Sequence, residues 1–342
     1  MHFTHSELAC ELAATTLGTL RAQAAGARLA LPSLPSAPGQ VHRAELTAAL
    51  TLCLFDGVLE RVPLAAAYAA DLQRAGKRLL LDHGAMRTVD APAGQLPRGR
   101  WAVARLLDPL GYEPTGVYPL ERLRMTGFVY THRDLPESLP QFFVSELHAG
   151  RFDEPFQAAT DRVVGASCDP LPGWTREALG ALSLDGALSF ATAAALLPNL
   201  LASFGRHHGP PRWSDYELLR EQSPEMAWIS TEGHAFNHAT DRVEDVRAVA
   251  DEQRRLGRPI KDAVEVSASG RVLQTAFRAT QVDRLFVGEH GETLLRSVPG
   301  SFHEFITRRP DEHGKLDLTF DASNAQGIFS MTGSSPGKRS KR

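Results

Sequence analysis

Residues able to bind a metal ion and a carboxylate occur together around His83. This histidine follows the apolar run 79–81, which predicts a short strand, and it precedes Gly84, a residue type that allows a backbone or a substrate to approach closely. Arg87 lies four residues further on, and its planar guanidinium can bind both oxygens of a carboxylate. The segment therefore predicts a metal ligand beside a substrate clamp. A structural histidine and an arginine in a surface ion pair would give the same pattern.

A second candidate ligand lies in the pair His234 and His238. A spacing of four places both side chains on one face of a helix, but a strand brings them to one face as well, so spacing alone does not choose between them. A helix is predicted over 243–256 with Asp241 as its N-cap. The position just before that helix favours His238 as the ligand. His234 would then support the site from behind the ligands, face the substrate, or be structural.

Glu304 is the candidate carboxylate ligand. It lies in a predicted strand between Phe302 and Ile306, and an inward-facing carboxylate is costly to bury unless it is paired or binds a metal. An ion pair with Arg308 or Arg309 is the competing explanation. Two histidines and one carboxylate with open positions form the facial triad of Fe(II) oxygenases, although the same donors suit Zn or Mn.

The elements that must position these residues recur in one order along the chain. The order is strand, histidine, helix, Leu-Gly and then several strands, which favours two copies of a βαβββ-like module. The first copy comprises 79–81, 101–108, 124–130 and 141–147. The second comprises 226–229, 243–256, 263–266, 272–279 and 301–307. Because the strands cluster, we expect an α+β fold with a curved, mixed or antiparallel sheet surrounded by helices.

The remaining segments are predicted to complete a single catalytic domain. Helices are expected over 4–29 and 44–75, with breaks near Asp56-Gly57 and at Pro63, and the apolar run 187–204 reads as a buried helix. The predicted parts are a helical N-terminal part (1–75), a first module (76–150), a helical insert (151–222), a second module (223–330) and a flexible basic tail (331–342).

Composition excludes several classes of function. The chain has 342 residues, 43% of them hydrophobic, enough to bury a large core, and a net charge of −3 gives no general attraction to nucleic acid or to an anionic membrane. Its three cysteines, Cys10, Cys53 and Cys168, are widely spaced, which argues against a disulfide framework or a cysteine-rich zinc site. The N-terminus lacks the pattern of a signal peptide, so we expect a soluble cytoplasmic protein. His207 and His208 are expected to be exposed in a loop.

Four stretches of the sequence resemble the 2-oxoadipate dioxygenase/decarboxylase family, which looks like a distant member of the vicinal-oxygen-chelate superfamily. They are 82–89 (DHGAMRTV), 127–147, 237–246 (NHATDRVEDV) and 302–308 (FHEFITR). The last is also similar to the strand that supplies the carboxylate ligand of 4-hydroxyphenylpyruvate dioxygenase, and 324–330 resembles the family's final, pocket-closing strand. The chain departs from the family in its shorter length and in Ala239 and Asp241, where text like NHLTPR is usual.

The resemblance implies a vicinal-oxygen-chelate-like fold and assigns the roles of the site residues. His83, His238 and Glu304 would bind Fe(II), and Arg87 would hold a substrate carboxylate. The implied partners are O2 and a small 2-oxo acid, and the implied reaction turns 2-oxoadipate into 2-hydroxyglutarate and CO2, a step in lysine breakdown. Both oxygen atoms of O2 enter the products of that one substrate.

Two other functions stay open from the sequence. A glyoxalase-like lyase or isomerase with Zn or Ni would need a fourth protein ligand, which the strand around residues 144–146 could offer. A metal-free small-ligand binding protein on the same scaffold is the other alternative. Consumption of O2 separates the dioxygenase from both.

Overall fold

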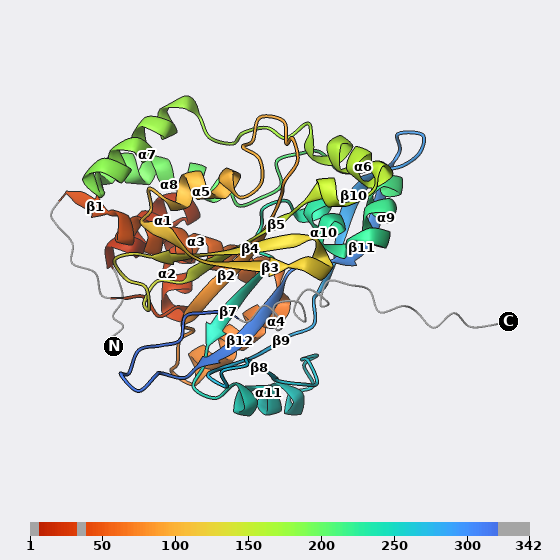
Figure 1. The fold of residues 1–342 in the computed structure, drawn as a ribbon. Helices are drawn as coiled ribbons and strands as arrows, with labels where there is room; N and C mark the ends of the chain where they lie inside the picture. Colours follow the sequence, from red (N-terminus) through yellow and green to blue (C-terminus); the bar gives the residue numbers. More distant parts are fainter. Residues whose placement is uncertain (1–6, 33–38, 321–342) are drawn as a thin grey trace.

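One curved sheet of eight strands runs through the centre of the molecule, with helices around it (Figure 1). The structure, a computed structural model, describes residues 7–32 and 39–320. In spatial order the strands are β3 (Tyr112–Leu120), β4 (Met125–His132), β5 (Gln141–Leu147), β2 (Leu81–Val89), β7 (His238–Arg242), β12 (Phe302–Arg308), β9 (Val272–Ala276) and β8 (Glu265–Val266). Parallel and antiparallel pairs both occur, so the predicted α+β class with a mixed, curved sheet is confirmed.

The sheet consists of two βαβββ modules of identical topology. The first is β2, α5 (Trp101–Leu107), β3, β4 and β5, and the second is β7, α11 (Val246–Arg255), β8, β9 and β12. In each module the first strand pairs in parallel with the last, and the two first strands meet antiparallel at the centre. The hairpin of β10 (Gln281–Val287) and β11 (Thr293–Pro299) is inserted between β9 and β12 of the second module. The repeat predicted from the order of elements is confirmed.

The register at the centre defines a local twofold relation between the modules. His83 pairs with Thr240, and Ala85 pairs with His238. Exchanging β2 and β7 therefore superimposes His83 on His238 and Ala85 on Thr240. The same exchange carries β5 onto β12. Phe143 pairs with Ala85, and Glu304 pairs with Thr240, each two residues after the histidine of its own module. Phe143 therefore corresponds to Glu304.

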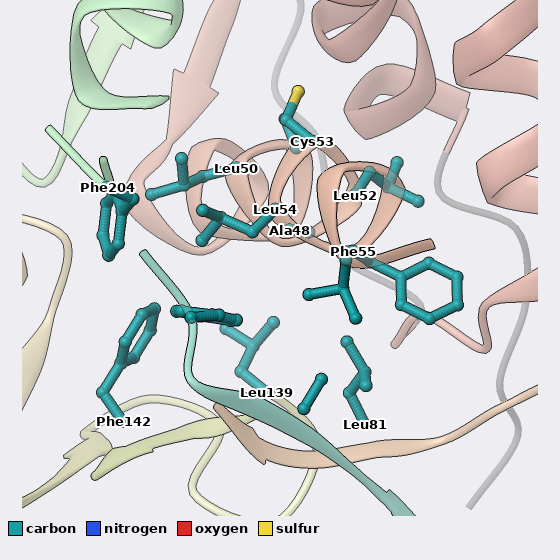
Figure 2. Packing of buried hydrophobic residues seen from close by; sticks show 14 of the residues in the cluster. Ala48, Leu50, Leu52, Cys53, Leu54, Phe55, Leu81, Leu139, Phe142 and Phe204 are labelled. Carbon is teal, nitrogen blue, oxygen red and sulfur yellow. The ribbon is translucent and has the colours of Figure 1, made fainter. Parts of the chain in front are cut away.

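A helical layer packs on one face of the sheet. It contains α1 (Glu7–Leu17), α2 (Thr19–Arg28), α3 (Arg43–Arg61), α4 (Pro63–Arg74) and α8 (Phe190–Ala202). Helix α3 is buried along most of its length, and Figure 2 shows Leu50 and Leu54 directed toward Leu81, Leu139 and Phe142 while Cys53 points to the opposite side. Burying one such leucine stabilises the fold by roughly 1.5–3 kcal/mol, so this layer anchors the strands that carry the site.

The remaining helices surround the other parts of the sheet. They are α6 (Glu154–Val164), α7 (Gly173–Asp185), α9 (Trp213–Gln222) and α10 (Pro224–Glu232), and β1 (Gln40–His42) pairs with β6 (Ala187–Ser189) beside α8. The run 187–204, expected as a buried helix, forms β6 and then α8, and α8 is buried on one face, at Ala193, Leu196, Leu197 and Leu200. Among the helices of the described residues, none is both long and apolar enough to cross a bilayer.

Several expected elements differ from the structure. The segment 226–229, expected as a strand, belongs to α10, where Ser223 caps the helix and Pro224 occupies its first turn. Residues 225–232 are all buried, so the segment has no amphipathic period by which a helix could be recognised.

Strands β3, β10 and β11 were not expected at all. Helix α3 passes through Gly57 without a break, whereas the break at Pro63 is confirmed.

Two expectations about the segments that carry the histidines are also wrong. His83 and His238 lie inside strands rather than after them, because β2 extends from Leu81 to Val89 and β7 begins at His238. Asp241 is a strand residue, and the cap of α11 is Asp245, whose carboxylate accepts from two backbone N–H groups. At the N-terminus, Gly18 with φ 83° divides the expected single helix into α1 and α2. The segments 324–330 and 331–342 lie outside the described residues.

Candidate metal centre

Three neighbouring strands at the junction of the modules bring His83, His238 and Glu304 together. Oε2 of Glu304 lies 3.4 Å from Nε2 of His83 and 3.3 Å from Nε2 of His238. All three side chains are buried, and their potential ligand atoms lie within 4.8 Å of one another. Residues more than 200 positions apart thus form one cluster, because the register places each of them on the same face of the sheet.

The cluster has the properties of a metal site. Metal–ligand bonds of about 2.0–2.2 Å place neighbouring ligand atoms roughly 3.0–3.5 Å apart, which matches the two separations from Glu304. Thr240 donates a hydrogen bond to Oε2 of Glu304 at 2.8 Å, while Oε1 is buried without a hydrogen-bond partner among the described residues. A fully buried carboxylate oxygen of this kind is costly unless a cation compensates it. The donor set therefore fits a first-row divalent metal.

The electrostatics of the cluster favour an ionised carboxylate. Burial alone would raise the pKa of Glu304, but hydrogen bonds and charge from His238 and His83 hold that pKa far below its ordinary value. Burial lowers the pKa of His238, against the effect of Glu304. Although burial opposes it, hydrogen bonds with Asp82 and Glu304 raise the pKa of His83, so a bound metal would displace the proton from its Nε2. An ionised carboxylate and neutral imidazoles are the protonation states in which these groups bind a metal.

The imidazole of His83 is oriented from behind by Asp82. A β-bulge lies between Leu81 and His83. At this bulge Oδ1 of Asp82 lies 2.9 Å from Nδ1 of His83. Arg308 and Arg242 both donate to the Asp82 carboxylate. Although burial opposes it, their charges keep the pKa of Asp82 well below its usual range. Asp82 thus fixes a proton on Nδ1 and leaves Nε2 to face the centre.

The other ligand residues have different supports. The ring of His238 stacks on Phe302 with centroids 4.8 Å apart, and the side-chain amide of Asn237 lies 3.2 Å from Nδ1 of His238. Arg308 is bound to Asp82 rather than to Glu304, so the competing ion pair expected for Glu304 is absent at Arg308. Gly84, expected to let a substrate approach, instead makes room for the ring of Phe236. A Cβ added at this position would lie 2.3 Å from that ring.

Arg87 is buried on the ligand face of β2, on the same side as His83 and Ala85. Its guanidinium carbon lies 5.0 Å from the ring centre of Trp228 in α10. Burial lowers the pKa of Arg87 to about 10, which Glu225 partly opposes, and the charge of Arg87 in turn lowers the pKa of His238. The arginine therefore stays cationic at neutral pH and lies at one end of the metal cluster.

His234 lies in a different cavity. Its ring centroid is 5.6 Å from that of His207, and Gly233, His207 and His208 line the same small space. Burial and these two histidines lower the pKa of His234 to about 3. His207 and His208, expected to be exposed, are half-buried there because α10 and its following turn cover the loop.

The strand expected to offer a fourth ligand directs its carboxylate elsewhere. Glu146 gathers with Asp90 and His148, and its Oε2 accepts a hydrogen bond from the backbone of Arg100. Phe143 occupies the position related to Glu304 by the twofold exchange. Within residues 7–32 and 39–320, the group around Glu304 has three members.

Asp82, Thr240 and Phe143 were not singled out by the sequence. Only Asp82 gave a signal, as a charged residue between the apolar run 79–81 and His83. Thr240 and Phe143 acquire their roles from pairing between distant strands, which no local pattern encodes.

Comparison with known proteins agrees with the geometry. A family model described as 2-oxoadipate dioxygenase/decarboxylase matches residues 57–329. This chain belongs to that family. The match to the 2-oxoadipate dioxygenase/decarboxylase family extends from α3 through both modules and includes all three metal-binding candidates, so the resemblance noted in the sequence is confirmed.

Individual proteins similar to this chain extend the comparison. The chloroplastic/amyloplastic 2-oxoadipate dioxygenase/decarboxylase of Oryza sativa subsp. japonica is 23% identical over 291 residues, covering 75% of this chain and 70% of that protein. A glyoxalase superfamily protein from Ralstonia eutropha JMP134 is 49% identical, with a TM-score of 0.89 over 94% of this chain and 99% of its own. The hydroxyglutarate synthase of Oryza sativa, solved with 2-oxoadipate, has a TM-score of 0.63 at 20% identity over 89% of this chain and 98% of its own. At that identity the last likeness supports the fold.

Proposed function

We propose that this chain is an Fe(II)-dependent dioxygenase that converts 2-oxoadipate and O2 into 2-hydroxyglutarate and CO2. The observation that carries the proposal is the buried cluster of two histidines and one carboxylate, in which Phe143 stands where a symmetric site would have a fourth ligand. Such a set leaves coordination positions for a chelating 2-oxo acid and for O2. Family membership supports the reaction, and the Oryza sativa enzyme solved with 2-oxoadipate supports the substrate.

The metal in this proposal is iron, held by Nε2 of His83, Nε2 of His238 and the carboxylate of Glu304. When bound, Fe(II) would supply the redox chemistry that activates O2. The overall change balances: the six-carbon acid loses C1 as CO2, its keto carbon becomes a carboxyl carbon, and the adjacent carbon is hydroxylated. Both oxygen atoms of O2 therefore enter the five-carbon product, and no further reductant is needed.

The side chains of the chain itself orient the substrate and exclude water. In this proposal Arg87 would bind the distal carboxylate through charge-assisted hydrogen bonds, each contributing about 1.5–3 kcal/mol. Trp228 packs against that guanidinium, and Phe302 and Phe143 provide apolar walls. Asp82 holds the Nδ1 proton of His83, so that this imidazole keeps one tautomer throughout turnover.

Anaerobic reconstitution with Fe(II), followed by measurement of O2 uptake against a panel of 2-oxo acids, tests the proposal. We expect 2-oxoadipate to be consumed with equal amounts of O2 and CO2, and isotopically labelled O2 to place both labels in 2-hydroxyglutarate. Iron-loaded protein that consumes no O2 with any 2-oxo acid would refute it. Turnover with Zn or Ni and without O2 would instead identify a glyoxalase-like lyase or isomerase.

A further inference from the structure

Helix α10 packs against β2 and carries two buried residues that act on Arg87, Glu225 and Trp228. Ser223 fixes the start of this helix, because its hydroxyl accepts from the backbone N–H of Met226 at 3.2 Å and donates to Oε2 of Glu225 at 3.0 Å. Positions three apart lie on one face of a helix, so Glu225 and Trp228 share a face. One rigid element therefore offers Arg87 both a negative charge and an aromatic ring.

Trp228 connects Arg87 to the strand that carries Glu304. The guanidinium of Arg87 lies over the ring of Trp228, with its central carbon 5.0 Å from the ring centre. The indole N–H donates to the backbone carbonyl of Gly300 at 3.2 Å. Gly300 precedes β12 by two residues, and its own N–H donates to the carbonyl of Thr280 at 2.8 Å, so the acceptor is itself held in place. One side chain thus contacts Arg87 of the first module and the segment that leads to Glu304 of the second.

The contact between Trp228 and Arg87 suits a cation that must be held in place and still bind an anion. A cation over an aromatic face is attracted by the ring, and the attraction grows where water is excluded. Both side chains are buried. Because a contact with the ring face uses none of the guanidinium N–H donors, it fixes the group without occupying the donors that would meet a carboxylate. Glu225 adds to this, since its charge opposes the lowering of the Arg87 pKa by burial.

Strand β2 sets the spacing between the metal cluster and the cation. His83 and Arg87 lie four residues apart on one face of this strand, about 13 Å between Cα atoms at 3.3 Å per residue. The backbone alone does not fix the guanidinium, because a long arginine side chain has many rotamers. The contact with Trp228 restricts those rotamers, so the separation between the metal ligands and the cation becomes one fixed length. A 2-oxo diacid of matching length reaches both ends, whereas one methylene more or less prevents this.

We propose that Trp228 is a positioning residue that holds Arg87 at one distance from the metal ligands and thereby sets the length of 2-oxo diacid that binds best. This inference rests on the proposed function, because it takes a 2-oxo acid as the ligand of the metal. It assigns the choice among diacids to a residue that acts through Arg87. Substitution of Trp228 should therefore weaken selection by length and leave metal binding intact.

The test is an anaerobic calorimetric titration of Fe(II)-loaded protein with 2-oxoglutarate, 2-oxoadipate and 2-oxopimelate, and with 2-oxohexanoate, which has no second carboxylate. Wild-type protein should bind 2-oxoadipate at least about tenfold more tightly than the diacids one carbon shorter or longer. Trp228→Leu should lose about tenfold in affinity for 2-oxoadipate and about threefold or less for 2-oxohexanoate, so that the preference among diacids largely disappears. Trp228→Phe keeps a ring but no indole N–H and should lie between the two.

Two controls isolate the effect of Trp228 on Arg87. Trp213→Leu is the matched change, because Trp213 stacks on Tyr216 in α9 and has its own cation, Arg296, at 5.5 Å from its ring centre. This variant should keep the wild-type preference. In an Arg87→Lys background, Trp228→Leu should change the affinities for the diacids by less than about threefold, since the group on which Trp228 acts is already lost. Iron content and thermal unfolding of each variant show whether the centre and the fold are intact.

The two proposals fail in different ways. If both Trp228 variants keep the wild-type preference, or weaken all four acids equally at full iron occupancy, Trp228 does not position Arg87 and the proposed function stands. Wild-type protein that binds the three diacids equally would also refute the inference alone. If wild-type protein with full iron occupancy binds none of the four acids, the proposed function is wrong and this inference is wrong with it.

Discussion

The two modules have the same topology and register but equip the metal centre differently. The first strand of each module contributes one histidine, and these two, His83 and His238, occupy equivalent positions. From the last strand the second module contributes Glu304, whereas the first has Phe143. The first module supports its histidine with a buried carboxylate, Asp82, while the second uses the Asn237 amide and stacking on Phe302.

This difference shows how a twofold scaffold becomes a directional site. A symmetric pair of modules would place two histidines and two carboxylates around the ion and leave little of it open. Under the proposed function, a phenylalanine in place of one carboxylate would leave the coordination sphere open on the side of the first module, and the substrate would enter there. The modules differ in function although they share a backbone plan.

The largest effect is expected where the second module supplies its ligands. Glu304→Ala and His238→Ala should each lower metal affinity by more than the roughly 10- to 100-fold that loss of an outer partner causes. His234→Ala, four residues from His238 but in another cavity, should retain the metal. Metal content after gel filtration and Co(II) titration measure this. Loss of metal in the His234 variant alone would mean that the wrong histidine has been assigned.

Giving the first module the carboxylate of the second should close the site. Phe143→Glu is expected to retain or tighten metal binding, because a fourth protein ligand reaches the ion, and to lower O2 uptake with 2-oxoadipate by about 100-fold or more, since too few positions remain for substrate and O2. Phe143→Leu keeps an apolar wall and should retain most activity. Equal activity of the Glu and Leu variants would show that position 143 does not face the open side.

The next effect concerns Arg87, whose counterpart in the second module, Arg242, donates to Asp82 and to the backbone carbonyl of Glu137. Arg87→Lys should keep bound metal but reduce kcat/KM for 2-oxoadipate by roughly tenfold to a thousandfold, because an ammonium does not reproduce a two-point contact with a carboxylate. Acids without a second carboxylate should be less affected. Steady-state kinetics at equal iron occupancy measure both. Activity within a few-fold of wild type for 2-oxoadipate would assign Arg87 to structure.

The smallest effect concerns the faces turned away from the metal, where Asp241 of the second module corresponds to Met86 of the first. Burial raises the pKa of Asp241 to about 7, although it accepts hydrogen bonds from Tyr68 and from the backbone of Leu80. Because the folded pKa lies above the unfolded one near 3.9, the folded state binds the extra proton, and stability falls as pH rises from about 4 to about 7. Asp241→Asn should flatten the pH dependence of thermal unfolding across this window, because the amide binds no proton on folding. An unchanged slope would contradict this origin.

Much of the centre was predictable because its ligands carry local signals. A histidine beside an apolar run and a glutamate between Phe302 and Ile306 are costly choices without a metal, and the order of elements around them repeats. The α+β class and the two modules followed from that order. The three candidates were joined into one ligand set by the family resemblance. The spacing of the residues in the sequence does not show that they meet.

The rest depended on tertiary pairing. The apolar segment 226–229 is a helix because Ser223 and Pro224 start it and the surrounding structure buries every side. Strand β3 has Glu113, Pro114 and Gly116 on a mostly exposed edge, so its composition resembles a loop. The equivalence of Phe143 with Glu304 exists only through register, which a single sequence does not state.

Arg308 links the support of one metal-ligand candidate to a segment further along the chain. Its buried side chain donates to the Asp82 carboxylate behind His83 and, through Nη1, to the backbone carbonyls of Asp317 and Thr319. The backbone around residues 317–319 and the orientation of the His83 imidazole are therefore coupled through one guanidinium, so a substitution of Arg308 should disturb both together.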